Sequence, residues 1–149
     1  INSLWLWGAG SLPQAMEKRF DSVWSNNPLA LGLGRAAGIP THAVPADAQA
    51  LLDASPADSH PLLVLEELLG PVQYEDGEAY RAALRSLETC YFAPLQKALA
   101  SGCISRLNIE ASTAYGALRW EATRSDQWKF WQRPQTLAAL ATALAKDPA

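Results

Sequence analysis

Short apolar runs alternate along the chain with longer segments in which apolar residues recur every three or four positions. The short runs predict strands covered on both faces, and the longer segments predict helices. The expected strands are residues 2–8, 21–25, 41–44, 61–66 and 104–111, with 114–123 as one more strand or a hairpin arm. The expected helices are residues 12–20, 28–37, 46–54, 77–101, 125–132 and 136–146. This alternation predicts an α/β fold, a three-layer sandwich with a mainly parallel sheet and helices on both faces.

Glycine and proline mark where several expected elements end. Gly38 ends the helix that precedes it, and Gly102 ends the longest expected helix, residues 77–101. Pro94 lies inside this long helix, where it removes one backbone hydrogen bond and should produce a kink. The stretch 70–76, with its glycine and proline, predicts a loop before the helix.

The composition is that of a globular protein, with 149 residues of which 49% are hydrophobic and 18% charged. This length predicts one α/β domain over residues 1–149. A core-like strand that starts at residue 1 without an initiator Met indicates an excised or proteolysed piece of a longer chain. The net charge of −3 offers no basic surface to nucleic acid or to an anionic membrane, so we expect neither as a partner.

Cysteine usage and the lack of a targeting segment favour a cytoplasmic location. Cys90 and Cys103 are the only cysteines and form no CxxC pair, so we expect two buried, reduced thiols. No apolar run approaches the roughly 20 residues that span a bilayer. Residues 1–8 also lack the basic flank and the cleavage site of a signal peptide.

A glycine turn, Gly8-Ala9-Gly10-Ser11, joins the first expected strand to the first expected helix. Backbone amides at such a junction can bind an anion, which makes Gly8, Gly10 and Ser11 candidates for an anion-binding site. The turn lacks the third glycine of a dinucleotide fingerprint and the Gly-Lys-Ser/Thr of a P-loop. We therefore favour a structural role, a tight corner between strand and helix.

The supply of histidines argues against a metal centre. A two-metal hydrolase site needs several His and Asp ligands that converge at strand ends. The chain has two histidines, His42 and His60, and each begins an expected strand. Ligands of an open parallel sheet gather at the carboxyl ends of the strands, the opposite edge. We expect surface or capping histidines, no metal site and no cofactor.

Acidic side chains do follow expected strands. Glu66 and Glu67 follow the run PLLVL, and Glu110 follows RLNI. Carboxylates can serve acid–base chemistry when burial raises the pKa of one of them. With no Ser or Cys in a G-x-S-x-G elbow, these residues and Glu121 are the catalytic candidates. Structural, solvated carboxylates are the favoured interpretation.

Aromatic residues gather toward the C-terminus, with Trp120, Trp128 and Trp131 close to basic residues. Aromatic and basic residues together can bind single-stranded nucleic acid, but the net charge is negative and the cluster is short. Packing onto the sheet is the favoured interpretation for Trp128 and Trp131, three positions apart on a helix. The alternative is an interface with a protein partner or with a missing domain, because Trp is favoured at binding hot spots.

Five segments resemble, in this order, parts of one known family. They are NSLWLWGAGSLP, NPLALGLGRAAGIPTHAV, HPLLVLEEL, SLETCYFAPLQKAL and RLNIEASTAYGALRWEATRSDQWKFWQRP. The chain resembles the C-terminal part of archaeal-type cofactor-independent phosphoglycerate mutases of the alkaline-phosphatase superfamily. It looks nearer still to bacterial phosphoglycerate-mutase-like or RpfE-type regulatory proteins, which carry a similar N-S-x-W-x-x-G-x-G segment. The resemblance implies an alkaline-phosphatase-like α/β fragment.

The same resemblance implies that this half of the protein has lost its metal ligands. Glu110-Ala111 stand where the family has an Asp-His pair. Residues 119–122 contain no histidine, although the family has its next His in this region. The run LEELLGP replaces Asp-x-x-Gly-His. The implied function is a degenerate, non-catalytic domain with a regulatory or binding role. Two alternatives stay open: a metal-dependent phosphomutase or phosphatase whose rearranged site a missing N-terminal part completes, and a small anion-binding module at Gly8–Ser11.

Overall fold

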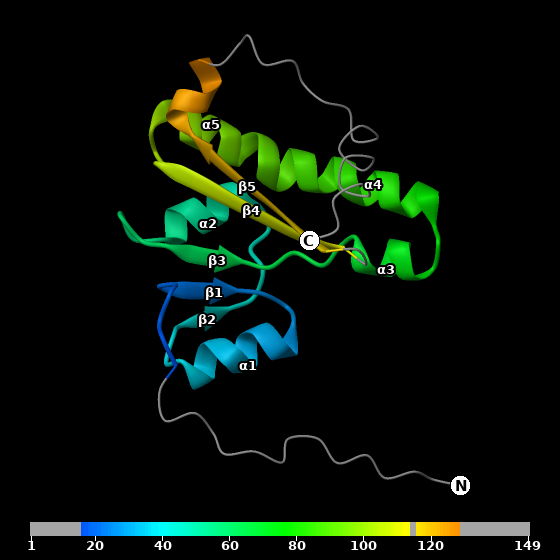
Figure 1. Cartoon of the computed structure of the whole chain (residues 1–149), viewed down its shortest axis with the longest axis horizontal. Helices are drawn as coiled ribbons and strands as arrows, with labels where there is room; N and C mark the ends of the chain where they lie inside the picture. Colours follow the sequence, from blue (N-terminus) through cyan, green and yellow to red (C-terminus); the bar gives the residue numbers. More distant parts are fainter. Residues whose placement is uncertain (1–15, 114–115, 129–149) are drawn as a thin grey trace, which may run out of the picture. The chain divides into compact units, whose positions relative to one another are not determined.

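The computed structural model describes residues 16–113 and 116–128, and the chain divides into two compact units, Ile1–Leu84 and Arg85–Ala149 (Figure 1). The described part is mixed α/β, as the alternation of short runs and helical segments predicts. The expected strand 2–8, the turn Gly8–Ser11 and the helix 136–146 lie outside the described residues. Within the described ranges, none of the helices combines the length and the apolar content of a membrane span.

A three-stranded parallel sheet forms the centre of the first unit. Its strands are β1 (Ser22–Trp24), β2 (Thr41–His42) and β3 (Pro61–Leu63), in the order β2-β1-β3. All three begin within the expected runs, which confirms these strands, although each is shorter than predicted. Because β1 is central, Trp24 pairs with His42 on one side and with Leu63 on the other.

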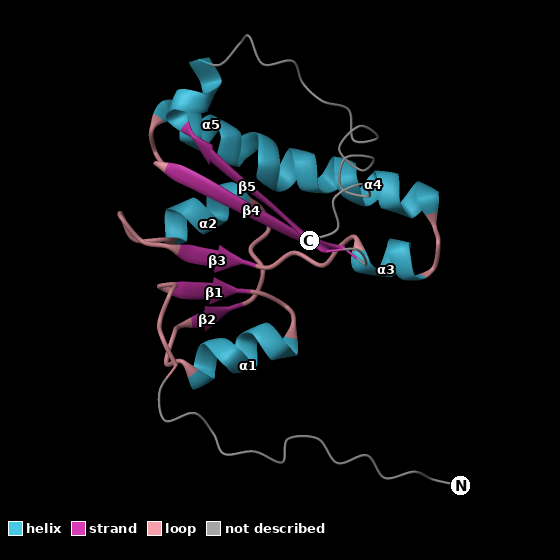
Figure 2. Ribbon diagram, in the orientation of Figure 1, coloured by secondary structure: helices cyan, strands magenta, loops and turns pink. Residues whose placement is uncertain are grey.

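Two helices connect these strands, α1 (Pro28–Ala36) and α2 (Ala48–Ala54), as Figure 2 shows. Each begins at a polar cap. The Asn27 side chain accepts from the amides of Leu29 and Ala30, and Asp47 accepts from the amide of Ala50. The connections β1–α1–β2 and β2–α2–β3 run in opposite directions across the sheet. Right-handed crossovers therefore assign α1 and α2 to opposite faces.

Gly34 lets α1 approach the sheet closely. A Cβ atom at this position would lie 2.8 Å from Cγ2 of Thr41 and 3.2 Å from Cγ2 of Val23. Both neighbours belong to strands, so the contact joins the helix to β1 and β2. The buried hydrophobic side chains of this unit are Val23, Ile39, Ala48 and Leu51.

The segment before β1 differs from the expectation of a helix over 12–20, because residues 16–20 have no helical structure. Glu17 and Arg19 form an ion pair of 3.1 Å, Nη2 to Oε2. Residues two apart share a face on an extended chain but not on a helix. Lys18 Nζ also donates to the Gly38 carbonyl oxygen over 3.1 Å, which holds the segment beside the end of α1.

A second difference lies at residues 70–76, where a short helix, α3 (Leu69–Gln73), replaces most of the expected loop. Pro71 is compatible with this helix because it stands in the first turn, where its missing N–H has no partner to lose. The helix ends before Glu75, whose φ of 53° is left-handed. Asp76 then caps the next helix by accepting from the amides of Glu78 and Ala79.

The long helix expected over 77–101 is present in three consecutive pieces. They are α4 (Gly77–Leu87), a π-helical turn η1 (Glu88–Phe92) and α5 (Ala93–Ser101). The wider turn directly precedes Pro94, which has no N–H and whose ring would crowd the carbonyl four residues earlier. A kink was predicted at this position, and the structure has a π turn there. Gly102, with φ 81°, ends α5 as predicted.

The second unit contains an antiparallel hairpin, β4 (Arg106–Thr113) with β5 (Gly116–Thr123), which confirms the hairpin-arm alternative. A 3-10 helix, η2 (Arg124–Trp128), follows where residues 125–132 were expected to be helical. One face of the hairpin carries Arg106, Asn108 and Glu110 opposite Thr123, Glu121 and Arg119. The other face carries Leu107, Ile109 and Ala111 opposite Ala122, Trp120 and Leu118. The buried side chains of this unit are Leu87, Tyr91, Ala98 and Leu99.

Both cysteines are free thiols, as expected, but their burial differs from the prediction. Cys90 is half-buried in η1, and Cys103 is exposed just after the cap of α5. The turn at Gly102 brings Cys103 beyond the end of the packed helix, which accounts for its exposure.

Candidate functional site at the carboxyl edge of the parallel sheet

The order β2-β1-β3 creates a topological switch point between β1 and β3. The chain leaves β1 toward β2 on one side and later returns to β3 on the other. The loops that follow β1 and β3 therefore lie at the carboxyl edge beside this switch point, the position at which open α/β sheets bind ligands. Residues 25–27 follow β1, and residues 64–67 follow β3.

A hydrogen bond joins these two loops. Asn27 Nδ2 donates to Glu66 Oε1 over 2.6 Å, while Asn27 Oδ1 accepts from the amides of Leu29 and Ala30 over 2.8 and 3.2 Å. One asparagine side chain thus caps α1 and positions the first glutamate after β3. Glu66 was a sequence candidate, whereas Asn27 was not among the candidate site residues.

Ser25 and Asn26 fix the loop after β1. Ser25 is 1% exposed, and its Oγ accepts from the Asn27 amide over 2.9 Å. Its own amide donates to the His42 carbonyl over 3.0 Å, which continues the ladder with β2. Asn26 Oδ1 accepts from the Val44 amide over 3.2 Å. The sequence Ser-Asn-Asn therefore ties the ends of all three strands together.

His42 lies at this same edge, which corrects the expectation that both histidines stand at the amino ends of strands. β2 has only two residues, so His42 is its last residue and pairs with Trp24, the last residue of β1. The two rings stack with centroids 4.3 Å apart and planes at 23°. Trp24 Nε1 donates to Ser22 Oγ over 3.0 Å, which holds the indole in place.

His60 does stand at the amino edge, as expected. Its ring lies 5.1 Å from that of Phe20, and its amide donates to Asp21 Oδ2 over 2.6 Å. In the described part of the chain, no group of three or more His, Cys, Asp or Glu side chains is placed to hold a metal ion.

The chemistry available at the carboxyl edge is that of a hydrogen-bond acceptor. The first amides of α1 are already satisfied by Asn27, so the helix offers less to an anion than an uncapped end would. The exposed Glu66 carboxylate keeps its second oxygen for a donor such as a hydroxyl, an amine or an amide. Glu67 beside it is exposed and makes no hydrogen bond or ion pair with any described residue.

The other two carboxylate candidates lie in the hairpin of the second unit, where each pairs with an arginine. Arg119 Nε and Nη2 donate to Glu110 Oε2 over 3.1 and 2.8 Å, directly across the ladder. Arg106 Nη1 lies 3.4 Å from Glu121 Oε2, a diagonal contact. Both glutamates therefore belong to the polar face of the hairpin.

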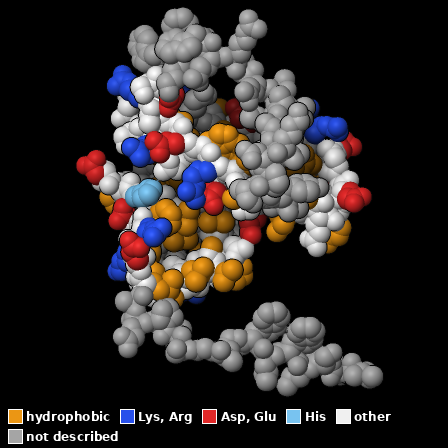
Figure 3. All heavy atoms as spheres, in the orientation of Figure 1, with side chains coloured by type: hydrophobic (Ala, Val, Ile, Leu, Met, Phe, Trp, Pro, Cys, Tyr) orange, Lys and Arg blue, Asp and Glu red, His pale blue; other side chains and the backbone are white. Residues whose placement is uncertain are grey.

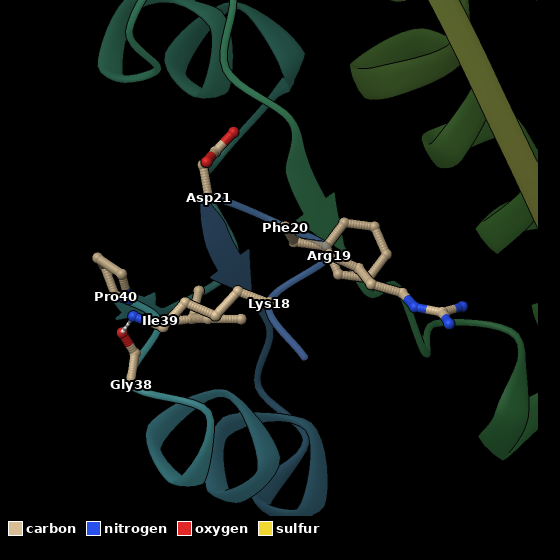
Figure 4. Close-up of a pocket in the computed structure, with 7 residues that line it drawn as sticks. All are labelled: Lys18, Arg19, Phe20, Asp21, Gly38, Ile39 and Pro40. Atoms are coloured by element: carbon tan, nitrogen blue, oxygen red, sulfur yellow. Dashed lines mark hydrogen bonds between the residues drawn. The ribbon is translucent and has the colours of Figure 1, made fainter. Parts of the chain in front are cut away.

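A hollow of about 250 Å³ lies at the opposite, amino edge of the sheet, and sequence reasoning missed it (Figure 4). It is lined by Lys18, Arg19, Phe20, Asp21, Gly38, Ile39 and Pro40. Figure 4 shows Lys18 turned toward Gly38 and Arg19 extended in another direction. Lys18 donates to a carbonyl at the end of α1, and Asp21 accepts from the amide of His60. These two charged side chains of the hollow therefore serve local structure. The adjacent Lys18-Arg19 pair was the only sequence signal for it.

Of the three tryptophans considered for an interface, the structure describes the side chain of Trp120 alone. It lies in β5 opposite Ile109 and is 41% exposed. The side chain of Trp128 and the whole of Trp131 lie outside the described part, as do Gly8, Gly10 and Ser11.

Comparison of the chain with protein-family models, with curated proteins and with solved structures found no match.

Proposed function

We propose that this chain is a degenerate, non-catalytic phosphoglycerate-mutase-like domain with a regulatory or binding role. The observation that carries the proposal is the ion pair between Glu110 and Arg119, 2.8 Å from Nη2 to Oε2. Glu110 stands where the resembled family has the Asp of its metal-binding Asp-His pair. Arg119 donates two hydrogen bonds to one oxygen of this carboxylate, and the guanidinium beside it repels a divalent cation.

The register of the hairpin supports the same proposal. Glu110 faces Arg119, and Glu121 lies diagonal to Arg106, so acidic and basic side chains alternate across one exposed face. Opposite charges across an antiparallel pair stabilise the strand pairing itself. These glutamates thus have a sufficient structural role without a catalytic one.

The binding role is assigned to the carboxyl edge of the parallel sheet. The Asn27–Glu66 hydrogen bond positions an exposed carboxylate at the switch point. The buried Ser25 fixes the loop after β1 by accepting from the Asn27 amide. This edge suits a ligand or a partner that donates hydrogen bonds. It does not suit an anionic ligand, because the carboxylates of Glu66 and Glu67 would repel it.

An activity assay with metal analysis tests the proposal. The chain is incubated with Mg²⁺, Mn²⁺ or Zn²⁺ and with a phosphoglycerate or p-nitrophenyl phosphate. We expect no turnover above that of heat-inactivated protein, and no stoichiometric metal after dialysis. Metal-dependent turnover that Glu110→Gln abolishes would overturn the proposal in favour of a rearranged metal site. The variant's circular dichroism spectrum controls for folding.

A further inference from the structure

α1 carries an apolar face that the described residues leave uncovered. Leu29 is 70% exposed and Leu33 is 50% exposed, and they lie four residues apart on one side of the helix. Gly32 and Ala36 are also exposed and continue the same surface. In Figure 3 hydrophobic side chains gather over α1. We call Leu29, Gly32, Leu33 and Ala36 the outer face of α1.

The opposite side of the same helix is already occupied. Gly34 is buried against Val23 and Thr41 of the sheet, so α1 cannot turn its leucines inward. Arg35 is the only charged residue of the helix, whereas a surface helix ordinarily carries a polar outer side. An apolar outer face of this kind marks a surface that another segment covers.

The chain itself supplies a segment of matching apolar character. Leu4-Trp5-Leu6-Trp7 are four large apolar residues in succession, and they precede the described part. Lys18 donates to the carbonyl of Gly38 just past the C-terminal end of α1, so the chain before Lys18 leaves from that end. The described end of the stretch that connects to this segment therefore lies beside the helix.

The available length is sufficient. Trp7 precedes Lys18 by 11 positions, which an extended chain spans over as much as about 36 Å. The nine residues of α1 extend over about 14 Å. A tether of this length also keeps the segment at a high effective concentration near the helix, which favours it over a separate molecule.

We propose that the apolar segment Leu4–Trp7 docks on the outer face of α1. The contact is an interaction within one chain, and it gives Leu29 and Leu33 the cover that the described residues do not. It involves neither the hairpin glutamates nor the carboxyl edge, and it takes the place of the strand expected over residues 2–8.

Cysteine cross-linking of the full chain tests this docking. In a Cys90→Ser, Cys103→Ser background, Ser3→Cys places a thiol next to the segment without removing an apolar residue. Gly32→Cys places the second thiol on the outer face, where an added Cβ meets nothing within 4 Å. The matched control is Gly70→Cys in α3, which has equally open space. With a short bismaleimide, we expect at least fivefold more intramolecular product for the 3–32 pair than for the 3–70 pair.

Two further variants separate docking from mere proximity. Leu33→Asp should lower the yield of the 3–32 product at least fivefold, whereas Leu69→Asp, at an exposed apolar position of α3, should leave it unchanged. Equal yields for the two pairs, or no response to Leu33→Asp, would overturn the proposal. Cross-linked dimers in place of the intramolecular product would also overturn it and would assign the outer face to a second copy of the chain.

Discussion

Asn27 and Glu66 are 39 positions apart in the sequence, yet Asn27 Nδ2 donates to Glu66 Oε1 over 2.6 Å. The contact joins the loop after β1 to the loop after β3 at the switch point between these strands. Because Asn27 also caps α1, one side chain couples the start of a helix to the loop that carries the exposed carboxylate. The two functions of Asn27 can be separated by substitution.

Asn27→Ala should lower the free energy of unfolding by about 1–2 kcal/mol, since the cap of α1 and the bond to Glu66 are both lost. Asn27→Asp keeps an acceptor for the helix amides but lacks the donor to Glu66 and places a second carboxylate beside it. We expect it to be less destabilising than Asn27→Ala at high salt, where the repulsion between the two carboxylates is screened. Urea denaturation of both variants measures this, and an Asn27→Ala variant as stable as wild type would contradict the capping role.

Gly34→Ala should destabilise the protein by about 1–3 kcal/mol, the cost of forcing a methyl into a packed contact. The new Cβ would lie 2.8 Å from Cγ2 of Thr41 and 3.2 Å from Cγ2 of Val23. The matched control is Gly32→Ala in the same helix, where nothing lies within 4 Å.

For Gly32→Ala we expect a gain of up to about 1 kcal/mol from helix propensity alone. Thermal unfolding of the two variants should therefore shift in opposite directions. Equal shifts would mean that α1 does not pack on the sheet through Gly34.

Local signals predicted the parallel sheet and its connecting helices well. The short run at β3 and the Gly38 stop each act over a few residues, so they can be read without knowledge of the fold. The stop at Gly102 is local in the same sense. The prediction of a helix over 12–20 was wrong for residues 16–20, because the contact of Lys18 with Gly38 is not local.

The candidate site was less predictable, because it depends on which strands lie side by side. The position of Glu66 after a strand was evident, but the order β2-β1-β3 brings it to Asn27. His42 was assigned to the wrong edge because a strand of two residues has no resolvable start and end in a sequence pattern. The pairing of Glu110 with Arg119 likewise required the hairpin register.

Arg119→Glu should lower the free energy of unfolding by about 1 kcal/mol, because it sets two carboxylates opposite each other across the ladder. The double exchange Glu110→Arg, Arg119→Glu should restore most of that loss. The wild-type pair is exposed, so its own contribution is below about 1 kcal/mol and should shrink further in high salt. Denaturation of the four members of this cycle at low and high salt measures the coupling, and its absence would remove the ion pair as an explanation for the role of Glu110.

Inorganic phosphate should leave the amide resonances of Gly10 and Ser11 unchanged at millimolar concentration. The turn Gly8-Ala9-Gly10-Ser11 lacks the lysine of a P-loop and the third glycine of a dinucleotide fingerprint, so backbone amides alone would have to hold the anion. A helix terminus without a cationic partner contributes only about 0.3–1 kcal/mol to such binding. A ¹H–¹⁵N titration of the full chain, with chloride at matched ionic strength as the control, provides the measurement. Saturable shifts confined to residues 8–11 would instead identify the chain as an anion-binding module, whatever the outcome of the activity assay.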